Sequence, residues 1–327
     1  MRCIAITSPG GPEALVPADR PAPLPGPGQI LVAVAAAGVN RPDALQRQGL
    51  YPPPKGASPL PGLEIAGTVS GHGEGVTSPP LGTRVMALLP GGGYAETVAV
   101  DARHILPLPD DLSFVEAAAM PETLFTVFAN LIEAGQLVEG ARVLVHGLTS
   151  GIGTMAIRLA TAYGAFIWGT AGTADRCRAA EALGAVRCYD YRQEDWAAAL
   201  STEPPMDIVL DMIGGDYVAK NLGLLAIGGR HVSIAFLGGA KATIPIPLVM
   251  TRRLHLTGST LRSRSDEEKA RLTAAIAQHV LPMIAEGTVR PVIDSVFPLA
   301  EAADAHRRLD DHHIGKIVLS VDGAAAP

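Results

Sequence analysis

The chain has 327 residues, of which 48% are hydrophobic and 18% are charged. This composition is too apolar for a disordered protein, and the length corresponds to about two globular domains. The formal net charge of −6 argues against the strongly basic surface that nucleic-acid binding requires. The longest apolar run, Ile30–Val39, is much shorter than the ~18 residues of a membrane-spanning helix. The sequence therefore predicts a two-domain globular protein without nucleic-acid or membrane partners.

Three cysteines, Cys3, Cys177 and Cys188, are dispersed along the chain and form no Cys-x-x-Cys motif. An odd number of dispersed cysteines is typical of unpaired thiols in a reducing compartment. Pro9 and Pro12 interrupt the N-terminal segment before the apolar core of a signal peptide could form. Both observations predict a cytoplasmic protein.

The first 120 residues have the pattern of a β-rich domain. Short apolar runs alternate there with turns rich in Gly and Pro, which is typical of successive short strands. The expected strands are Ile30–Ala36, Ile65–Val69, Arg84–Leu89 and Glu96–Val100.

From about Ala141 the pattern changes, and strand-like runs alternate with helical stretches. This alternation is typical of a parallel sheet with helices on both faces. The expected strands of this half are Val143–His146, Ala165–Thr170, Met206–Asp211, Arg230–Ala235 and His255–Gly258, and the expected helices are Thr154–Tyr163, Ala174–Leu183 and Tyr217–Leu225. The C-terminal part adds helices over Glu267–Ala285 and Glu301–Leu309, strands over Val292–Phe297 and Ile317–Val321, and a frayed GAAAP tail.

A glycine-rich turn connects the first strand of the alternating half to its first helix. There Gly151-x-Gly153-x-x-Ala156 follows an apolar strand and begins a helix, which is the context of a dinucleotide-binding turn. Glycines let the backbone approach a pyrophosphate, and a helix N-terminus supplies unpaired N–H groups and a positive dipole end. We therefore expect Ser150, Gly151, Ile152 and Gly153 to bind a dinucleotide cofactor. The alternative is that the glycines only permit a tight turn.

The end of the second strand of this half indicates which dinucleotide binds. Folds that bind NAD usually place Asp or Glu there, whereas this chain has Gly172, which leaves room, and Thr173, which offers a hydroxyl. Arg176 adds a planar guanidinium that suits a phosphate, and Tyr191 lies just past the third strand. The pattern favours NADPH. Asp175 is either a ribose ligand or a first-turn carboxylate favoured by the helix dipole, and both alternatives stay open.

Five groups of residues along the chain carry a family resemblance. They are Gly38-Val-Asn40-x-x-Asp43, Gln48-Gly49-x-Tyr51-Pro52, Pro61-Gly62-x-Glu64-x-x-Gly67, Gly93-Tyr94-Ala95-Glu96 and Ser150-Gly-Ile-Gly153. As a set they resemble the zinc-independent quinone oxidoreductases, the zeta-crystallin-like branch of the medium-chain dehydrogenase/reductase superfamily. The stretches MALLPGGG, NRPDALQRQG and LRSR are most similar to the tumour-suppressor-inducible quinone oxidoreductase group.

The resemblance covers nearly the whole chain and implies an α/β fold with two domains. A GroES-like β-rich catalytic domain would comprise residues 1–122 and 262–327, and a Rossmann domain with a doubly wound parallel sheet would comprise residues 123–261. The family also implies NADPH as the cofactor and, usually, a homodimer formed by pairing of Rossmann sheets.

Two residues depart from the zinc-dependent enzymes of the superfamily. Leu63 stands where those enzymes have the histidine of Gly-His-Glu, and Asn40 stands near their catalytic cysteine. Because leucine cannot bind a metal, the catalytic zinc site cannot be assembled, and we expect no metal. His306, His312 and His313 are close in sequence but lack a second ligand group, so we expect packing or exposed histidines.

The resemblance also names the residues of the substrate pocket. It implies that Asn40 donates to a carbonyl oxygen that gains charge, and that Tyr51 donates a hydrogen bond or a proton. Thr126 would hold the nicotinamide ribose or the pocket wall, and Phe236 and Leu261 would line the nicotinamide. The alternative for Tyr51 is that the Tyr-Pro pair only anchors a loop.

These observations predict an NADPH-dependent quinone reductase that delivers hydride or single electrons to ortho- or para-quinones. A quinone is electron-poor, so the protein needs to supply only position and electrostatics. One alternative is an enone or enal reductase, which would use the same hydride on a carbon–carbon double bond. Another, of a different class, is a non-catalytic NADPH-binding sensor or structural protein.

Overall fold

The computed structural model describes residues 1–321, and its packing divides the chain into two compact units. Unit 1 contains Met1–Phe125, Arg262–Gly287 and the chain from Pro291 onward, whereas unit 2 contains Thr126–Leu261 and Thr288–Arg290. The GAAAP tail, for which we expected fraying, lies outside the described residues. Within the described range, no helix is both long enough and apolar enough to cross a membrane.

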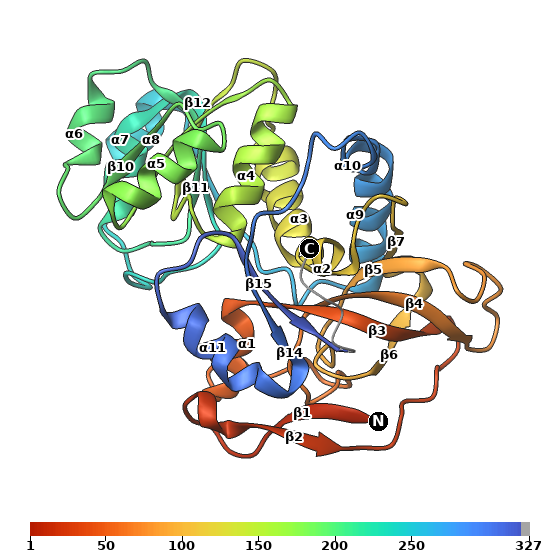
Figure 1. The fold of residues 1–327 in the computed structure, drawn as a ribbon. Helices are drawn as coiled ribbons and strands as arrows, with labels where there is room; N and C mark the ends of the chain where they lie inside the picture. The colour runs from red at the N-terminus through yellow and green to blue at the C-terminus, as the bar shows by residue number, and fades with distance from the viewer. Residues whose placement is uncertain (322–327) are drawn as a thin grey trace. The chain divides into compact units, whose positions relative to one another are not determined.

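Unit 1 is organised around β3 (Gln29–Val39), a long strand that is paired along both edges. One edge pairs with β4 (Glu64–His72), and the other pairs first with β6 (Thr97–Asp101) and then with β15 (Lys316–Ser320). All of these pairings are antiparallel. The remaining strands of unit 1 are β1 (Arg2–Ile6), β2 (Leu15–Asp19), β5 (Arg84–Leu88), β7 (Ile105–Pro107) and β14 (Ile293–Pro298) (Figure 1).

The sequence of β3 explains why this strand can lie at the centre of the sheet. In its first half, buried Ile30, Val32 and Val34 alternate with more exposed residues, as in a strand with one face on the core. In its second half, the small residues Ala36–Val39 are all buried. The strand therefore ends deep inside the unit, and the residue that follows it, Asn40, is buried as well.

Short helices also occur in the first 120 residues, which the β-rich pattern did not predict. The helix α1 (Arg41–Arg47) begins directly after β3, where the Asp43 carboxylate accepts a hydrogen bond from the Asn40 N–H at 2.9 Å. Seven residues are too few for a helical period to be distinguished from a loop. The other helices that lie in or begin in unit 1 are α2 (Phe114–Ala118), α3 (Pro121–Val127), α9 (Asp266–His279), α10 (Leu281–Ala285) and α11 (Ala302–Asp310).

The expectation of one helix over Glu267–Ala285 was wrong. The structure has two helices, α9 and α10, which are separated at Val280. Pro282 lacks the N–H that would continue the α9 ladder, and its ring would clash with the carbonyl four residues earlier. The proline therefore lies in the first turn of a new helix, a position that tolerates it.

Unit 2 contains a six-stranded sheet in the order β10-β9-β8-β11-β12-β13, with every neighbouring pair parallel. In chain order this is the 3-2-1-4-5-6 arrangement of a Rossmann fold, so the predicted α/β class is confirmed. The strands are β8 (Arg142–His146), β9 (Phe166–Ala171), β10 (Arg187–Asp190), β11 (Met206–Asp211), β12 (Leu225–Ser233) and β13 (His255–Gly258), and the connecting helices are α4 (Gly151–Ala162), α5 (Ala174–Ala182), α6 (Trp196–Ser201), α7 (Tyr217–Leu224) and α8 (Ile246–Arg252) (Figure 1).

Candidate functional site

The glycine-rich turn lies between β8 and α4, as predicted. The Ser150 hydroxyl caps α4 by accepting a hydrogen bond from the Gly153 N–H at 3.0 Å. A Cβ atom at Gly153 would lie 2.4 Å from the backbone of Leu148, so only glycine fits there. The N–H groups of Gly151 and Ile152 have no hydrogen-bond partner in the described part of the chain. The turn can therefore bind an anion at the N-terminus of α4.

Arg176 is attached to this turn through its side chain. Its Nε donates to the hydroxyl of Thr149 at 2.8 Å, and Thr149 is fully buried. The backbone N–H of Arg176 donates to the Thr173 hydroxyl at 3.3 Å, so Thr173 caps α5. The two terminal nitrogens of Arg176 bond to no residue that the structure describes. The guanidinium is thus held beside the turn with its terminal N–H groups available for a phosphate.

Tyr191 and Arg192 follow β10 and lie against the end of β9. A Cβ atom at Gly172 would lie 3.0 Å from the Tyr191 hydroxyl and 3.5 Å from the Nε of Arg192. The Arg192 guanidinium lies 5.9 Å from the centre of the Tyr191 ring. Arg192 was not among the predicted site residues, although it lies two residues after the third strand, at the carboxyl end of the sheet, where open α/β folds bind their ligands.

Asp175 forms an ion pair with Arg178, three residues further along α5. Their side chains are 85% and 70% exposed, respectively. Asp175 also lies in the first turn of α5, where the helix dipole favours a carboxylate. The exposed ion pair and the position in the first turn agree with the alternative of a first-turn carboxylate favoured by the helix dipole.

Taken together, these residues fit a dinucleotide that carries a phosphate on its adenosine ribose. The unpaired N–H groups after Ser150 and the close approach at Gly153 suit a pyrophosphate. Arg176 and Arg192 bring two cations to the carboxyl ends of β9 and β10, and the nearby Asp175 is paired with Arg178. A second phosphate is the group that this donor set suits best.

In unit 1, a buried ion pair lies at the end of β3. Lys316 Nζ is 2.6 Å from Glu64 Oε1, and the two side chains are only 4% and 0% exposed. The sheet register pairs Ile317 with Val39, which brings Lys316 to Asn40. The ammonium also donates to Asn40 Oδ1 at 2.5 Å and to the Val39 carbonyl at 3.0 Å, so all three of its N–H bonds are used.

This ion pair orients the Asn40 amide. The amide oxygen accepts from Lys316, and the amide nitrogen donates to Glu64 at 2.8 Å, so only one placement of the two atoms satisfies both neighbours. One N–H of the amide is thereby committed to Glu64, and the other has no partner among the described residues. The donation that we expected from Asn40 therefore rests on a single N–H. Lys316 and Glu64 were not among the predicted site residues.

A second buried chain of hydrogen bonds crosses unit 1. Arg47 donates to Nδ1 of His306 at 3.1 Å; because arginine can only donate, Nε2 of His306 carries the ring proton. Nε2 then donates to the Tyr94 hydroxyl at 3.1 Å, which donates to Asp43 at 3.3 Å. Burial lowers the pKa of His306 to about 3 and raises the pKa of Asp43 to about 6. His306 is a packing residue, as expected.

Tyr51 lies in the loop after α1 and is half-buried. Its N–H donates to the Leu45 carbonyl at 3.2 Å, while its hydroxyl has no hydrogen-bond partner among the described residues. The Arg262 guanidinium lies 5.3 Å from the centre of its ring. Burial raises the pKa of Tyr51, and the nearby Arg262 cation opposes that rise. Tyr51 therefore presents a protonated, unbonded hydroxyl at neutral pH.

Glu122, at the start of α3, was not among the predicted site residues. Its backbone N–H donates to the Glu64 carboxylate at 2.8 Å, which brings the two acidic residues together. Burial, followed by repulsion from Glu64, raises the pKa of Glu122 to about 8, although the Lys316 cation opposes the rise. The carboxyl is therefore mostly protonated in the folded protein at neutral pH.

We expect Glu122→Gln to stabilise the protein by about 1–3 kcal/mol at pH 8 and by much less at pH 5. An unfolded glutamate has a pKa near 4.5, whereas the folded value is about 8. Between these values the folded state binds the extra proton, so its stability falls as the pH rises, and glutamine removes that loss. Urea unfolding at both pH values measures the effect, with the exposed Glu74→Gln as control. An equal effect at the two pH values would contradict the assignment.

Three other predicted residues lie in unit 2. The Thr126 carbonyl accepts a hydrogen bond from the Asn130 amide at 2.8 Å. Leu261 is buried, whereas Phe236 is 68% exposed. Phe236 borders a pocket of about 390 Å³ beyond the carboxyl ends of β11 and β12, which Gly214 and other residues line. Ligands of open α/β sheets bind at this end of the strands.

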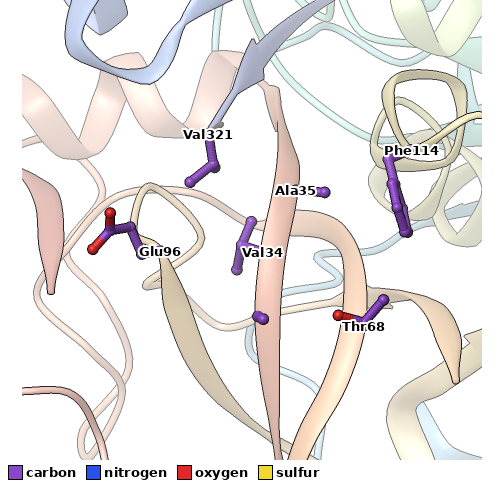
Figure 2. Close-up of a pocket in the computed structure, with 7 residues that line it drawn as sticks. Val34, Ala35, Thr68, Glu96, Phe114 and Val321 are labelled. Atoms are coloured by element: carbon purple, nitrogen blue, oxygen red, sulfur yellow. The ribbon is translucent and has the colours of Figure 1, made fainter. Parts of the chain in front are cut away.

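A second hollow, of about 410 Å³, lies in unit 1 and contains none of the predicted residues. Its lining side chains come from both sides of β3, as Figure 2 shows for Val34 and Ala35. Its carboxylate, Glu96, is already paired with Arg2. This hollow offers no chemical group that suggests a role in the site.

The interior residues of unit 2 agree with their predictions. His146 is fully buried and bonds to Thr170 at 3.1 Å and to Asn221 at 2.8 Å, which confirms it as a satisfied interior residue. Burial lowers its pKa to about 4. Cys177 and Cys188 are buried, as expected of small apolar side chains.

Comparison with known proteins identifies the family of the chain. Residues 26–110 match an alcohol dehydrogenase GroES-like domain, and residues 183–319 match a zinc-binding dehydrogenase. The quinone oxidoreductase of Lama guanicoe is 32% identical over 328 residues, which cover 98% of this chain and 97% of that protein. The chain belongs to the quinone oxidoreductase-like family of the medium-chain dehydrogenase/reductase superfamily.

Proteins with different names are similar to this chain. The synaptic vesicle membrane protein VAT-1 homolog of Rattus norvegicus is 32% identical, with 98% of this chain and 84% of that protein covered. The structure of Escherichia coli quinone oxidoreductase complexed with NADPH has a TM-score of 0.87 and 28% identity, with 98% of this chain and 100% of that chain covered. The predicted GroES-like and Rossmann architecture of this oxidoreductase is thereby confirmed.

Proposed function

We propose that this family member reduces quinones with NADPH and without a catalytic metal. The observation that carries the proposal is the network at Asn40, where the Lys316 ammonium and the Glu64 carboxylate hold a neutral amide with one N–H unused. Leu63, buried between Gly62 and Glu64, has no atom that could bind zinc. Such a site can donate hydrogen bonds but has no built Lewis acid, which suits an acceptor as electron-poor as a quinone.

In this proposal unit 2 holds the cofactor. When bound, NADPH would supply a hydride from its nicotinamide ring. Residues 150–153 would bind the pyrophosphate, and Arg176, Tyr191 and Arg192 would surround the 2′-phosphate. Thr126, Phe236 and Leu261 would contact the nicotinamide riboside, as the family resemblance implies.

In the same proposal unit 1 supplies two neutral donors to the acceptor. The free N–H of Asn40 and the hydroxyl of Tyr51 donate to quinone oxygens as these gain negative charge. The raised pKa of Tyr51 keeps its proton in place at neutral pH, so the hydroxyl remains a donor. Because Lys316 already orients the Asn40 amide, the amide does not have to rotate when negative charge develops on the quinone oxygen.

The protonated state of Glu122 supports a second candidate function, the reduction of enones or enals. That reaction requires a proton at the carbon next to the carbonyl, and Glu122 is a mostly protonated carboxyl at neutral pH. Tyr51 is another proton source for the same step.

A steady-state panel tests these functions. We expect turnover of para- and ortho-quinones with NADPH, slower turnover with NADH, and no loss of rate after dialysis against a strong chelator. Faster turnover of cyclohexenone than of any quinone would favour the second candidate. No turnover of either class with bound NADPH would favour a non-catalytic NADPH-binding protein, and loss of activity on chelation would contradict the metal-free mechanism.

We expect Tyr51→Phe to lower kcat/KM for quinones by about 1–3 kcal/mol in transition-state free energy. The loss reflects the removed hydroxyl donor, so it should be smaller for the most electrophilic quinones. The affinity for NADPH should not change. A graded quinone series measures the effect, with Tyr163→Phe, a half-buried tyrosine of unit 2, as control. If all quinones are reduced at the wild-type rate, Tyr51 only anchors its loop.

We also propose a homodimer formed through the edge of the unit 2 sheet. The strand β13 is the last of that sheet, and all four of its residues are exposed. Ile246, Met250 and Leu256, which lie on β13 and the preceding helix α8, are exposed as well. An unpaired edge with apolar neighbours is a common site of strand pairing between chains. Sedimentation equilibrium should give the mass of two chains, and a monomer would contradict the proposal.

The free cysteines support a reducing location. Cys3, Cys177 and Cys188 are all unpaired and buried. Unpaired thiols are usual in cytosolic proteins, and we therefore propose the cytoplasm as the compartment.

A further inference from the structure

A buried arginine lies against the Tyr51 loop, and the proposed function gives it no role. Arg262 is only 6% exposed. Its Nε donates to the Pro90 carbonyl at 2.9 Å, its Nη1 to the Tyr51 carbonyl at 3.2 Å, and its Nη2 to the Gln46 side-chain oxygen at 2.6 Å. One guanidinium thus joins α1, the loop after it, and the loop that precedes Gly91.

The same guanidinium contacts Tyr51 a second time, through the ring. Its carbon lies 5.3 Å from the ring centre, within the range of a cation–π interaction. Backbone and ring of Tyr51 are therefore restrained by one side chain, whereas the hydroxyl is left without a partner in the described chain. Contacts of this kind fix the position of the Tyr51 ring and leave its hydroxyl available to donate a hydrogen bond to a ligand.

Fold stability alone is a poor explanation for such an arginine. Burying a charge is unfavourable unless it is paired, and none of the residues described in the structure gives Arg262 a carboxylate in contact. Its three acceptors are neutral, and a second buried cation, Lys269, donates to its carbonyl at 3.1 Å. The carboxyl groups that face it at longer range are those of Asp43 and Glu122.

We propose that Arg262 is a positioning residue that holds Tyr51 so that its hydroxyl is presented to the acceptor. The catalytic part of this inference rests on the proposed function, whereas the positioning part does not. The Arg262 cation also acts on the hydroxyl through charge, because it favours the phenolate and so opposes the effects of burial and of Glu122.

Fluorine NMR tests the positioning part without any turnover. The chain has six tyrosines, so labelling with 3-fluorotyrosine gives six resonances, and Tyr51→Phe identifies the one that belongs to Tyr51. We expect Arg262→Met to raise the pKa of Tyr51, because the cation that favours the phenolate is lost, and to shift or broaden its resonance, with the other five unchanged. Arg262→Lys keeps the charge but lacks the planar fork, so the resonance should move while the pKa changes little.

The matched control is Arg264→Met, because Arg264 lies two residues further on and pairs with Glu268 at 3.1 Å. It should leave the Tyr51 resonance in place. If Arg262→Met does not fold, Arg262→Lys decides alone. An unchanged Tyr51 resonance in the folded Arg262 variants would overturn the positioning role, whatever Tyr51 does in the reaction.

Kinetics then test the catalytic part. We expect Arg262→Lys to lower kcat/KM for para-benzoquinone by roughly 10-fold, with the Kd for NADPH unchanged. In a Tyr51→Phe background the same substitution should have a much smaller effect, because the hydroxyl it positions is absent. An equal loss in both backgrounds would show that Arg262 does not act through Tyr51. If Tyr51→Phe itself is without effect while the fluorine signals move, the proposed role of Tyr51 fails and the positioning stands.

Discussion

Replacing Lys316 with methionine is expected to lower the free energy of unfolding by about 3–5 kcal/mol. The substitution leaves the Glu64 carboxylate buried without its cation, and it removes the donor to the Asn40 oxygen. The cost is large because an unpaired charge in a buried site cannot be solvated by water. Urea unfolding of the wild type and the variant at pH 7 measures the difference.

The double variant Lys316→Met with Glu64→Gln separates this cause from a simple loss of packing. It removes both charges, so part of the lost stability should return. Lys55→Met, at an exposed position, should change stability by less than about 0.5 kcal/mol. If the double variant is no more stable than Lys316→Met, the penalty does not come from the uncompensated Glu64 charge.

Replacing Arg176 with alanine is expected to weaken NADPH binding by roughly one to two decades while barely changing NADH binding. The guanidinium is already held by Thr149 beside the glycine-rich turn, so its terminal N–H groups need little reordering to meet a 2′-phosphate. NADH lacks this phosphate and loses nothing. Titration of each cofactor by its own fluorescence gives both dissociation constants.

Arg178→Ala is the matched control for this prediction, since Arg178 lies on the same helix and pairs only with the exposed Asp175 among the described residues. It should leave the preference for NADPH over NADH within about twofold, as expected for an exposed ion pair. An equal loss of both cofactors in Arg176→Ala would instead mean that Arg176 supports the fold of the turn or the pyrophosphate site.

The local sequence pattern was sufficient to predict most of the strands and helices of unit 2. The strands Met206–Asp211 and His255–Gly258 were predicted at their observed bounds. For Met206–Asp211 the reason is that buried parallel strands appear as mostly apolar runs, whereas His255–Gly258 is an exposed edge strand. The glycine-rich turn was predictable because β8, the glycines and the start of α4 lie within fifteen successive residues, so that their spacing can be recognised in the sequence. The seven-residue helix α1 and the division at Pro282 needed the structure.

The substrate side of the site depended on distant parts of the chain. Lys316 is 276 residues from Asn40 and 252 from Glu64, and only the pairing of β15 with β3 brings them together. Arg262 is likewise 211 residues from Tyr51. No local pattern could indicate that the Asn40 amide has one of its N–H groups committed, because that follows from neighbours that the sheet register supplies.

By itself, the sequence determined the fold class, the family and the position of the glycine-rich turn, because each depends on residue types at short spacings. Tertiary structure alone decided the ionisation and orientation of the side chains. The pKa of Glu122 is about 8 because folding partly buries it beside Glu64, and that of His306 is about 3 because folding buries it beside Arg47. Burial and the distance between charges set these values, and both exist only once strands and loops that are remote in sequence have packed together.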